Sequence, residues 1–380
     1  MKIAFEAKRA FNNFTGLGNY ARFVISAIDK HLDADGLLLY TPGIKDHPEA
    51  QAFYRKYKNQ VIQPKGVYSK GALKKVWRSA SIYKNAVKEN ANIFHGLSNE
   101  LPSGYNNKTK RIVTIHDLIF LRYPEYYPFI DRNIYKRKFK KACTSSDAII
   151  AVSEQTKADI IEFLGIPEEK IQVVYQGVHD NYHIEIGTER MLHLTQKYGL
   201  HRPYLLYVGS IEERKNALQM VKAFKRMKEQ NPKDDTLLIL VGKKTKYQEA
   251  VEKEIRQLNI IEDVLILNKV PFGELPFLYK GAAGTIYPSS FEGFGIPVLE
   301  SLTMRTPVLA GKGSAMEEAG GKHALYADPF QVEEFAAQIS KLINDQSLST
   351  GMLSGVEEHL AKFTSKKIAS DLERVYNSVL

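Results

Sequence analysis

The sequence has few of the features that mark secreted or membrane-spanning proteins. Cys143 is its only cysteine, so no internal disulfide can form, which argues against an extracellular scaffold. We expect this lone thiol to be a small buried apolar group. The N-terminus lacks the apolar stretch of about 7–15 residues found in secretory signals, and no run approaches the roughly 18 apolar residues of a membrane span. The sequence therefore predicts a cytoplasmic protein.

Acidic residues are scarce in one part of the chain. The net charge is +10, and residues 51–150 hold 20 Lys and Arg against 6 Asp and Glu, while the remainder is slightly acidic. A basic region of this kind attracts anionic membrane surfaces, nucleic acid or phosphate-bearing substrates. Two interpretations stay open: peripheral contact with the inner face of the membrane through residues 51–150, or a solvated face of lysine-rich helices.

Short apolar runs alternate with helical patterns along the chain, which is typical of parallel α/β sheets. A length of 380 residues suits two such cores. The series restarts after Ile184–Leu200, a segment of weak strand character. We therefore predict two Rossmann-like domains, residues 1–185 and residues 186–364. A C-terminal helix at residues 365–380 either closes the second domain or crosses back to the first.

Individual elements follow from the same patterns, with a polar glycine-bearing loop expected at Asn12–Gly18. The predicted strands are Lys2–Glu6, Gly36–Tyr40, Ile93–His95, Ile112–Ile115, Ala148–Val152, Ile171–Val174, Pro203–Val208, Thr236–Val241, Val264–Leu267, Gly284–Ile286 and Pro307–Leu309. The predicted helices are Asn19–Lys30, Lys74–Lys88, Arg132–Cys143, Asn216–Glu229, Tyr247–Leu258, Pro297–Met304 and Val332–Asn344.

The strongest functional signal follows the strand Gly284–Ile286. Gly293 and Gly295 flank Phe294, so backbone N–H groups of this loop can approach a ligand closely. The helix predicted from Pro297 turns its positive dipole end toward the loop, which suits phosphate oxygens. A surface loop without a ligand would give the same pattern.

Two carboxylates belong to the same segment. Glu292 lies in the loop and Glu300 in the helix, with seven residues between them. Carboxylates accept hydrogen bonds from neighbouring sugar hydroxyls, so the pair can reach two parts of one ligand. The residues Glu292, Gly293, Phe294, Gly295, Pro297, Glu300 and Ser301 resemble the hallmark of retaining glycosyltransferases of family 4.

This resemblance implies the GT-B fold, in which two Rossmann-like domains face each other across a central cleft. It implies that Glu292 lies by the donor sugar and that Glu300 binds the ribose hydroxyls. Gly16 and Gly18 resemble the family's glycine loop over the diphosphate, although a structural turn explains them as well. His116 resembles the histidine that contacts the donor sugar near the reacting carbon, and a capping or core histidine is the alternative.

A basic turn follows the strand that ends at Val208. Lys215 resembles the family's lysine that binds the donor diphosphate, and Arg214 resembles the adjacent arginine. Ser210 stands where many members carry a phosphate-binding arginine, which bears on how the diphosphate charge is shared. The resemblance thus assigns His116, Glu292, Lys215 and Arg214 to catalysis and Gly16, Gly18, Ser210, Gly293, Phe294, Gly295 and Glu300 to donor binding.

The resemblance implies a hexosyltransferase that retains anomeric configuration and needs no metal or cofactor beyond its nucleotide-sugar substrate. GDP-mannose is the favoured donor, because the regions of His116 and Lys215 resemble bacterial mannosyltransferases; a UDP-sugar is the alternative. The acceptor is expected to be a glycan or lipid-linked glycan of surface polysaccharide synthesis. The first domain would bind the acceptor and the second the donor.

Three other classes of protein are alternatives. A nucleic-acid-binding protein fits the sequence pI of about 9.2, but no DNA- or RNA-binding signature is present. An NAD-dependent oxidoreductase would need a tight glycine turn, whereas Gly16 and Gly18 lie in a longer predicted loop. A non-catalytic sensor of nucleotide-sugars is the third. The triplet Asp33-Ala34-Asp35 follows a helix and is interpreted as a surface turn, not as a metal site.

Overall fold

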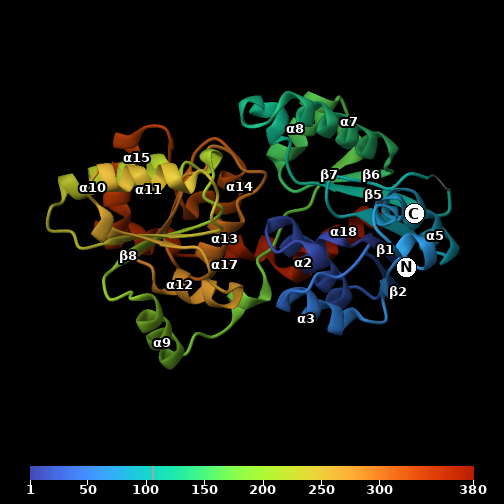
Figure 1. Cartoon of the computed structure of the whole chain (residues 1–380), viewed down its shortest axis with the longest axis horizontal. Helices are drawn as coiled ribbons and strands as arrows, with labels where there is room; N and C mark the ends of the chain where they lie inside the picture. Colours follow the sequence, from blue (N-terminus) through green and yellow to red (C-terminus); the bar gives the residue numbers. More distant parts are fainter. Residues whose placement is uncertain (105–106) are drawn as a thin grey trace. The chain divides into compact units, whose positions relative to one another are not determined.

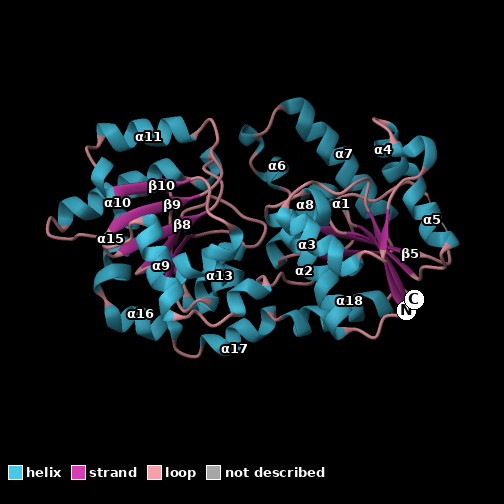
Figure 2. Ribbon diagram, turned by 60° about the horizontal axis from the view of Figure 1, so that its bottom comes forward, coloured by secondary structure: helices cyan, strands magenta, loops and turns pink. Residues whose placement is uncertain are grey.

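The computed structural model describes residues 1–104 and 107–380, which form two compact units. The first unit joins Met1–Gly177 to Lys362–Leu380, and the second comprises Val178–Ala361. Each unit is built around one parallel sheet with helices packed on it (Figures 1 and 2). The last residues of the chain therefore belong to the same unit as the first.

The first unit contains a seven-stranded parallel sheet of order β3-β2-β1-β4-β5-β6-β7. β1 and β4 are neighbours at the point where the strand order reverses, with Ile3 opposite Ile93. In open α/β sheets, ligands bind outside the carboxyl ends of the strands at such a point. The strands are β1 (Lys2–Glu6), β2 (Gly36–Tyr40), β3 (Val61–Ile62), β4 (Ile93–Gly96), β5 (Lys110–Ile115), β6 (Ala148–Ala151) and β7 (Ile171–Val173).

The C-terminal helix α18 (Ser365–Asn377) packs against α2 (Gly16–His31) in the first unit. Its apolar residues recur at helical spacing, and Ile368, Leu372 and Tyr376 are buried. The other helices of this unit are α1 (Lys8–Asn12), α3 (Pro48–Tyr57), α4 (Leu73–Val76), α5 (Ile82–Lys88), α6 (Ile119–Arg122), α7 (Phe129–Ser145) and α8 (Glu154–Leu164).

The second unit contains a six-stranded parallel sheet of order β10-β9-β8-β11-β12-β13. Here the order reverses between β8 and β11, where Leu205 pairs with Gly284. The strands are β8 (Tyr204–Val208), β9 (Leu237–Val241), β10 (Val264–Leu267), β11 (Gly284–Tyr287), β12 (Val308–Gly311) and β13 (Leu325–Ala327).

Helices cover both faces of this second sheet. α10 packs against α15 and against α11 on one side, and α12, α13 and α17 lie on the other side (Figure 1). The helices are α9 (Thr188–Tyr198), α10 (Ala217–Gln230), α11 (Gln248–Gln257), α12 (Leu275–Gly281), α13 (Ile296–Thr303), α14 (Met316–Gly320), α15 (Val332–Asn344), α16 (Gln346–Leu353) and α17 (Val356–Leu360).

Every strand predicted from the sequence is present, but some loops were assigned wrongly. Gly16 and Gly18 lie in the first turn of α2, not in a loop. The side chain of Asn13 explains this early start, because its Oδ1 accepts hydrogen bonds from the N–H groups of Thr15 and Gly18 at 3.0 and 3.1 Å. The segment of weak strand character at Ile184–Leu200 contains helix α9.

Candidate active site

The point of strand reversal in the second unit gathers the charged residues singled out in the sequence. The turn that carries Arg214 and Lys215 follows β8, and the loop that carries Glu292 follows β11. Carboxyl ends of neighbouring parallel strands meet at one sheet edge, so turn and loop lie together. The backbone N–H of Ser290 donates to the Arg214 carbonyl at 3.0 Å and ties them.

Glu292 is the centre of this cluster. Its Oε1 accepts hydrogen bonds from Lys215 Nζ at 2.6 Å and from Arg214 Nη1 at 3.0 Å. The same oxygen accepts from the hydroxyl of Ser289 at 2.6 Å and from that of Tyr287 at 3.2 Å. Two cations and two hydroxyls therefore hold one carboxylate in a fixed position.

Burial and charge set the protonation states in the cluster. The side chains of Lys215 and Glu292 are only 11% and 14% exposed. Burial opposes the ionisation of Glu292, but the charges of Arg214 and Lys215 outweigh it and lower its pKa to about 2. Burial lowers the pKa of Lys215, although Glu292 opposes this shift. Glu292 is thus a carboxylate at any physiological pH.

The loop after Glu292 is shaped by its glycine at position 295. Gly295 has φ = +127° and caps the N-terminus of α13. A Cβ at this position would lie 3.1 Å from Met316 Cα, so a larger residue would be strained and crowded. Phe291 and Phe294 are buried and anchor the loop on both sides of Gly293. The loop therefore presents its backbone near the positive end of α13.

Glu300 lies on α13 in a different environment. Its Oε2 accepts a hydrogen bond from the hydroxyl of Tyr279 at 2.8 Å, and Tyr182 lies close by. Burial raises the pKa of Glu300 to about 7, although the hydrogen bond from Tyr279 lowers it. Burial is the main cause of the raised pKa of Tyr279, and the charge of Glu300 raises that pKa further.

Four tyrosines in this unit were not predicted as site residues. Tyr207 at the end of β8 and Tyr287 at the end of β11 have nearly parallel rings whose centroids are 6.1 Å apart. Tyr207 also donates to the Ser210 carbonyl at 2.8 Å and so holds that turn. Their position close to the carboxyl ends of adjacent strands is the one signal in the sequence that could have indicated them. Tyr182 and Tyr279 carry no such signal.

His116 and the glycine pair belong to the first unit. His116 directly follows β5 and is buried, with its Nε2 2.9 Å from the Leu97 carbonyl. Because a carbonyl only accepts, Nε2 carries the proton and Nδ1 of the neutral ring is an acceptor. Burial lowers the pKa of His116 to about 4, so the ring is neutral. Tyr20 lies on the helix that begins with Gly16 and Gly18. Its ring meets that of His116 edge-on, with the two ring centroids 4.6 Å apart.

A buried polar chain continues from this point to the end of the sequence. The Tyr20 hydroxyl lies 3.1 Å from Thr114 Oγ1, which lies 2.8 Å from His95 Nε2. His95 Nδ1 lies 2.8 Å from the hydroxyl of Tyr376 on α18. Sequence reasoning did not predict these contacts, which join residues far apart in the chain.

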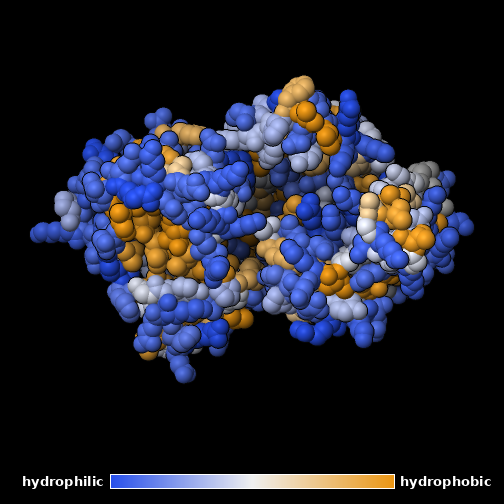
Figure 3. All heavy atoms as spheres, in the orientation of Figure 1, coloured by the Kyte–Doolittle hydropathy of each residue, from blue (hydrophilic) through white to orange (hydrophobic). Residues whose placement is uncertain are grey.

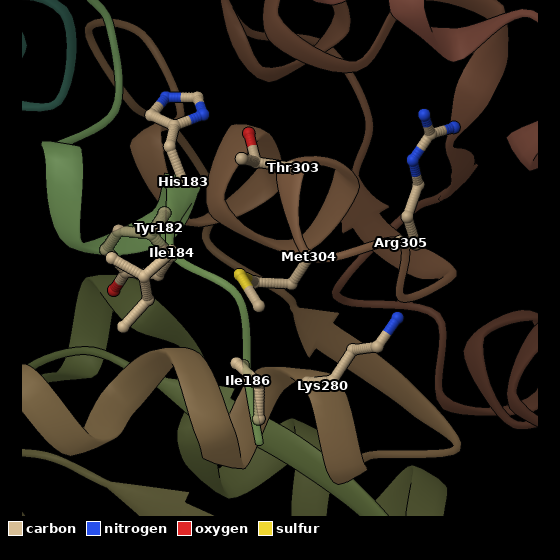
Figure 4. A pocket seen from close by; sticks show the side chains of 8 residues that line it. All are labelled: Tyr182, His183, Ile184, Ile186, Lys280, Thr303, Met304 and Arg305. Atoms are coloured by element: carbon tan, nitrogen blue, oxygen red, sulfur yellow. The ribbon is translucent and has the colours of Figure 1, made fainter. Parts of the chain in front are cut away.

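A hollow of about 370 Å³ lies elsewhere in the second unit. Figure 4 shows Lys280 and Arg305 on one side of it and Tyr182 and Ile184 on the other. Met304 and Arg305 follow the C-terminal end of α13, whereas the glycine loop precedes its N-terminal end. The hollow is therefore separate from the cluster around Glu292.

Within residues 1–104 and 107–380, no group of three or more His, Cys, Asp or Glu is arranged to hold a metal ion. In the same part of the chain, every helix is too short or too polar to cross a membrane.

Residues 195–356 match the family described as "Glycosyl transferases group 1", and residues 30–182 match "Glycosyltransferase Family 4". The chain belongs to the family 4 glycosyltransferases. The resemblance found in the sequence is thereby confirmed.

Curated relatives of this family 4 glycosyltransferase include mannosyltransferases. The O-antigen chain mannosyltransferase B of Escherichia coli is 28% identical over 67% of this chain and 66% of its own length. The O-antigen chain mannosyltransferase RfbU of Salmonella typhimurium is 28% identical over 60% of each chain. The match thus spans less than two thirds of these relatives.

Solved structures share the fold across the full length. Anabaena HepE in complex with UDP and glucose superposes with a TM-score of 0.74 at 16% identity, with 100% of both chains covered. A glycosyltransferase from Rickettsia africae gives 0.75 at 17% identity, covering 100% of this chain and 98% of its own. The predicted α/β class with two Rossmann-like domains of the GT-B type is confirmed.

Proposed function

We propose that this family 4 glycosyltransferase moves a hexose from a nucleotide-sugar to a glycan acceptor with retention of configuration. The observation that carries the proposal is the cluster of Arg214, Lys215 and Glu292 beside the glycine loop and the N-terminus of α13. Cations and backbone N–H groups at the carboxyl edge of a parallel sheet suit a diphosphate.

The second domain, residues 186–364, would bind the donor. Negative charge grows on the departing diphosphate as the sugar bond breaks, and Lys215, Arg214 and the loop around Gly293, Phe294 and Gly295 would stabilise it. Ser210 has no positive charge, unlike the arginine common at this position. Arg214 would therefore neutralise a larger share of the negative charge on the diphosphate. With these donors in place no metal is required.

The two carboxylates would hold the donor at different points. Glu300, held by Tyr279, accepts hydrogen bonds from the ribose hydroxyls. Glu292, which remains ionised, lies by the sugar and stabilises positive charge that develops there. No nucleophile is assigned, because nothing in the geometry shows Glu292 attacking carbon.

The first domain, residues 1–185, would bind the acceptor, with the helix at residues 365–380 completing it. Nδ1 of His116 would accept a hydrogen bond from a sugar hydroxyl near the reacting carbon. Gly16 and Gly18, in the first turn of α2, would contact the diphosphate. The reaction would take place in the cytoplasm on a glycan or lipid-linked glycan of surface polysaccharide synthesis.

GDP-mannose is the donor we favour, because curated relatives in O-antigen synthesis are mannosyltransferases. A UDP-sugar is the alternative, supported by the fold shared with an Anabaena protein bound to UDP and glucose. A thermal-shift panel of GDP, UDP, ADP and their sugars tests this, since a ligand that binds the folded state raises Tm. We expect GDP and GDP-mannose to raise Tm most; a selective response to UDP ligands favours the alternative, and no response to any nucleotide contradicts the proposed function.

A further inference from the structure

Exposed apolar side chains gather in two segments of the first unit. Among the described residues, eight of the 14 exposed large hydrophobic side chains lie at residues 67–76 and 129–135. Phe129 and Ile130, at the start of α7, are each 71% exposed, and Ile134 is 44% exposed. Figure 3 shows hydrophobic atoms at the outer edge of this unit, where Figure 1 draws α7. Contiguous exposed apolar groups mark interaction sites more often than scattered ones do.

The outward face of α7 changes from apolar to basic along its length. Ile130, Ile134, Arg137 and Lys141 are spaced by four, three and four residues, so they lie on one face of the helix. Phe129 lies at the start of the adjacent face of α7, and basic residues follow it farther along that face. The basic residues of this helix are Arg132, Lys136, Arg137, Lys138, Lys140 and Lys141, against the single acidic residue Asp131.

The second segment repeats this combination around α4. Val67 is 69% exposed, and Leu73 and Val76 are also exposed. No acidic residue occurs from residue 65 to residue 88. The basic residues there are Lys65, Lys70, Lys74, Lys75, Arg78, Lys84 and Lys88.

The side chain of Glu100 links the two segments. It contacts Arg78, which closely follows α4, at 3.0 Å and Lys138 of α7 at 3.5 Å. The segments therefore approach each other on one unit, and we call residues 65–78 and 129–141 together the basic–apolar face.

We infer that the basic–apolar face docks on an anionic phospholipid bilayer. The exposed aliphatic and phenylalanine side chains enter the boundary between headgroups and acyl chains, and the lysines and arginines contact lipid phosphates. Nucleic acid would use the cations but not the aliphatic side chains, which have no partner on a phosphate backbone. The basic region of residues 51–150 was expected from the sequence, and the inference names the side chains within it that would contact the bilayer. Residues 105 and 106 of that region lie outside the described residues. The inference does not depend on the proposed sugar transfer.

Vesicle co-sedimentation of the full chain measures this directly. We expect binding at least about tenfold stronger to phosphatidylcholine vesicles with about 30% phosphatidylglycerol than to pure phosphatidylcholine. Raising salt from about 0.1 M to about 0.5 M should weaken it, because screening shortens the reach of the cations. The triple variant Phe129→Ser, Ile130→Ser, Ile134→Ser should lower binding about tenfold.

A matched control removes the same side-chain types from the other unit. The variant Leu192→Ser, Ile261→Ser, Phe330→Ser loses two aliphatic residues and one phenylalanine that are also exposed. It should bind anionic vesicles like the unsubstituted protein. Nucleotide-induced thermal shifts of both variants test the sugar-transfer proposal separately, since neither touches the cluster around Glu292.

A tryptophan introduced into the basic–apolar face reports insertion into the bilayer and keeps the face apolar. Trp77 is the only tryptophan and is buried, but it lies within the basic–apolar face, so the quenching of each probe is measured against that of the unsubstituted protein. Phe129→Trp should be quenched by brominated acyl chains in anionic vesicles, whereas Phe330→Trp should not be. Equal binding to neutral and anionic vesicles, equal loss in the control variant, or quenching of neither or of both tryptophans would overturn the inference. Salt-dependent binding to a DNA duplex without vesicle binding would overturn it in favour of nucleic acid.

Discussion

Glu300 is buried and Glu292 is largely buried, yet their neighbours shift the pKa values of the two carboxyl groups in opposite directions. Arg214 and Lys215 lower the pKa of Glu292 to about 2 against the effect of burial. Glu300 has hydroxyl neighbours and no cation among the causes of its shift, so burial raises its pKa to about 7. One residue type in one motif therefore has two protonation behaviours.

The raised pKa of Glu300 predicts a pH-dependent stability. A carboxyl group whose folded pKa exceeds its unfolded value of 4.5 binds its proton more tightly when folded, so stability falls as pH rises toward about 7. Glu300→Gln removes this penalty, and we expect its free energy of unfolding to exceed that of the wild type by up to about 3 kcal/mol above pH 7 and to match it near pH 4.

The same variant should bind donor nucleotides more weakly, because an amide oxygen accepts weaker hydrogen bonds from the ribose hydroxyls than a carboxylate does. Urea denaturation at several pH values and nucleotide titration measure the two effects. Unchanged donor affinity would count against the ribose role, and a stability difference independent of pH would count against the raised pKa.

Lys215 is expected to be essential for turnover. Lys215→Ala removes a largely buried cation that would face the leaving diphosphate, and we expect kcat to fall roughly 100-fold. Steady-state kinetics with the donor found by the thermal-shift panel measures this. Lys280→Ala, which removes a lysine from the separate hollow, is the control. Activity of Lys215→Ala within a factor of about two of wild type would exclude Lys215 from the site.

At the scale of elements, the start of a helix can depend on one glycine whose backbone conformation or close packing a larger residue would not allow. Gly295 adopts a positive φ that most side chains disfavour, and Gly18 lies against the carbonyl of Asn13. A Cβ at Gly18 would come 1.8 Å from that oxygen, whereas a Cβ at Gly16 would meet nothing within 4 Å. Of this glycine pair, only Gly18 is required by the fold.

This difference predicts unequal effects of alanine at the two positions. Gly18→Ala should lower Tm by several degrees, because the start of α2 must shift away from Asn13. Gly16→Ala should leave Tm nearly unchanged, and any loss of activity in it would then report contact with the substrate. Differential scanning calorimetry of both variants provides the measurement, and equal changes in Tm would contradict the packing described for Gly18.

At the scale of the whole molecule, the end of the chain completes the unit that its beginning starts. α18 packs on α2, and Tyr376 reaches His95, which is 281 residues away in the sequence. The same polar chain continues through Thr114 to Tyr20 beside His116. Stability of the first unit therefore depends on residues that follow the entire second unit.

Removing one hydroxyl tests this dependence. Tyr376→Phe leaves a buried nitrogen of His95 without its partner, and we expect the free energy of unfolding to fall by about 1–3 kcal/mol. Asn377→Ala, on the exposed face of the same helix, should change it by less than about 0.5 kcal/mol. Equal effects of the two substitutions in urea denaturation would contradict the buried hydrogen bond.

The sequence by itself determined the α/β class, the parallel strands and the family, because hydrophobic periodicity and the glutamate motif are local patterns. It also indicated Arg214, Lys215 and Glu292 as a group. It missed α9, the early start of α2 and the four tyrosines, since short apolar runs and lone aromatic residues fit several structures. Only the tertiary structure decided that Lys215 pairs with Glu292 across 77 residues and that the pKa of Glu300 is raised to about 7. Those properties depend on burial and on distances between residues remote in sequence, and a local pattern contains neither.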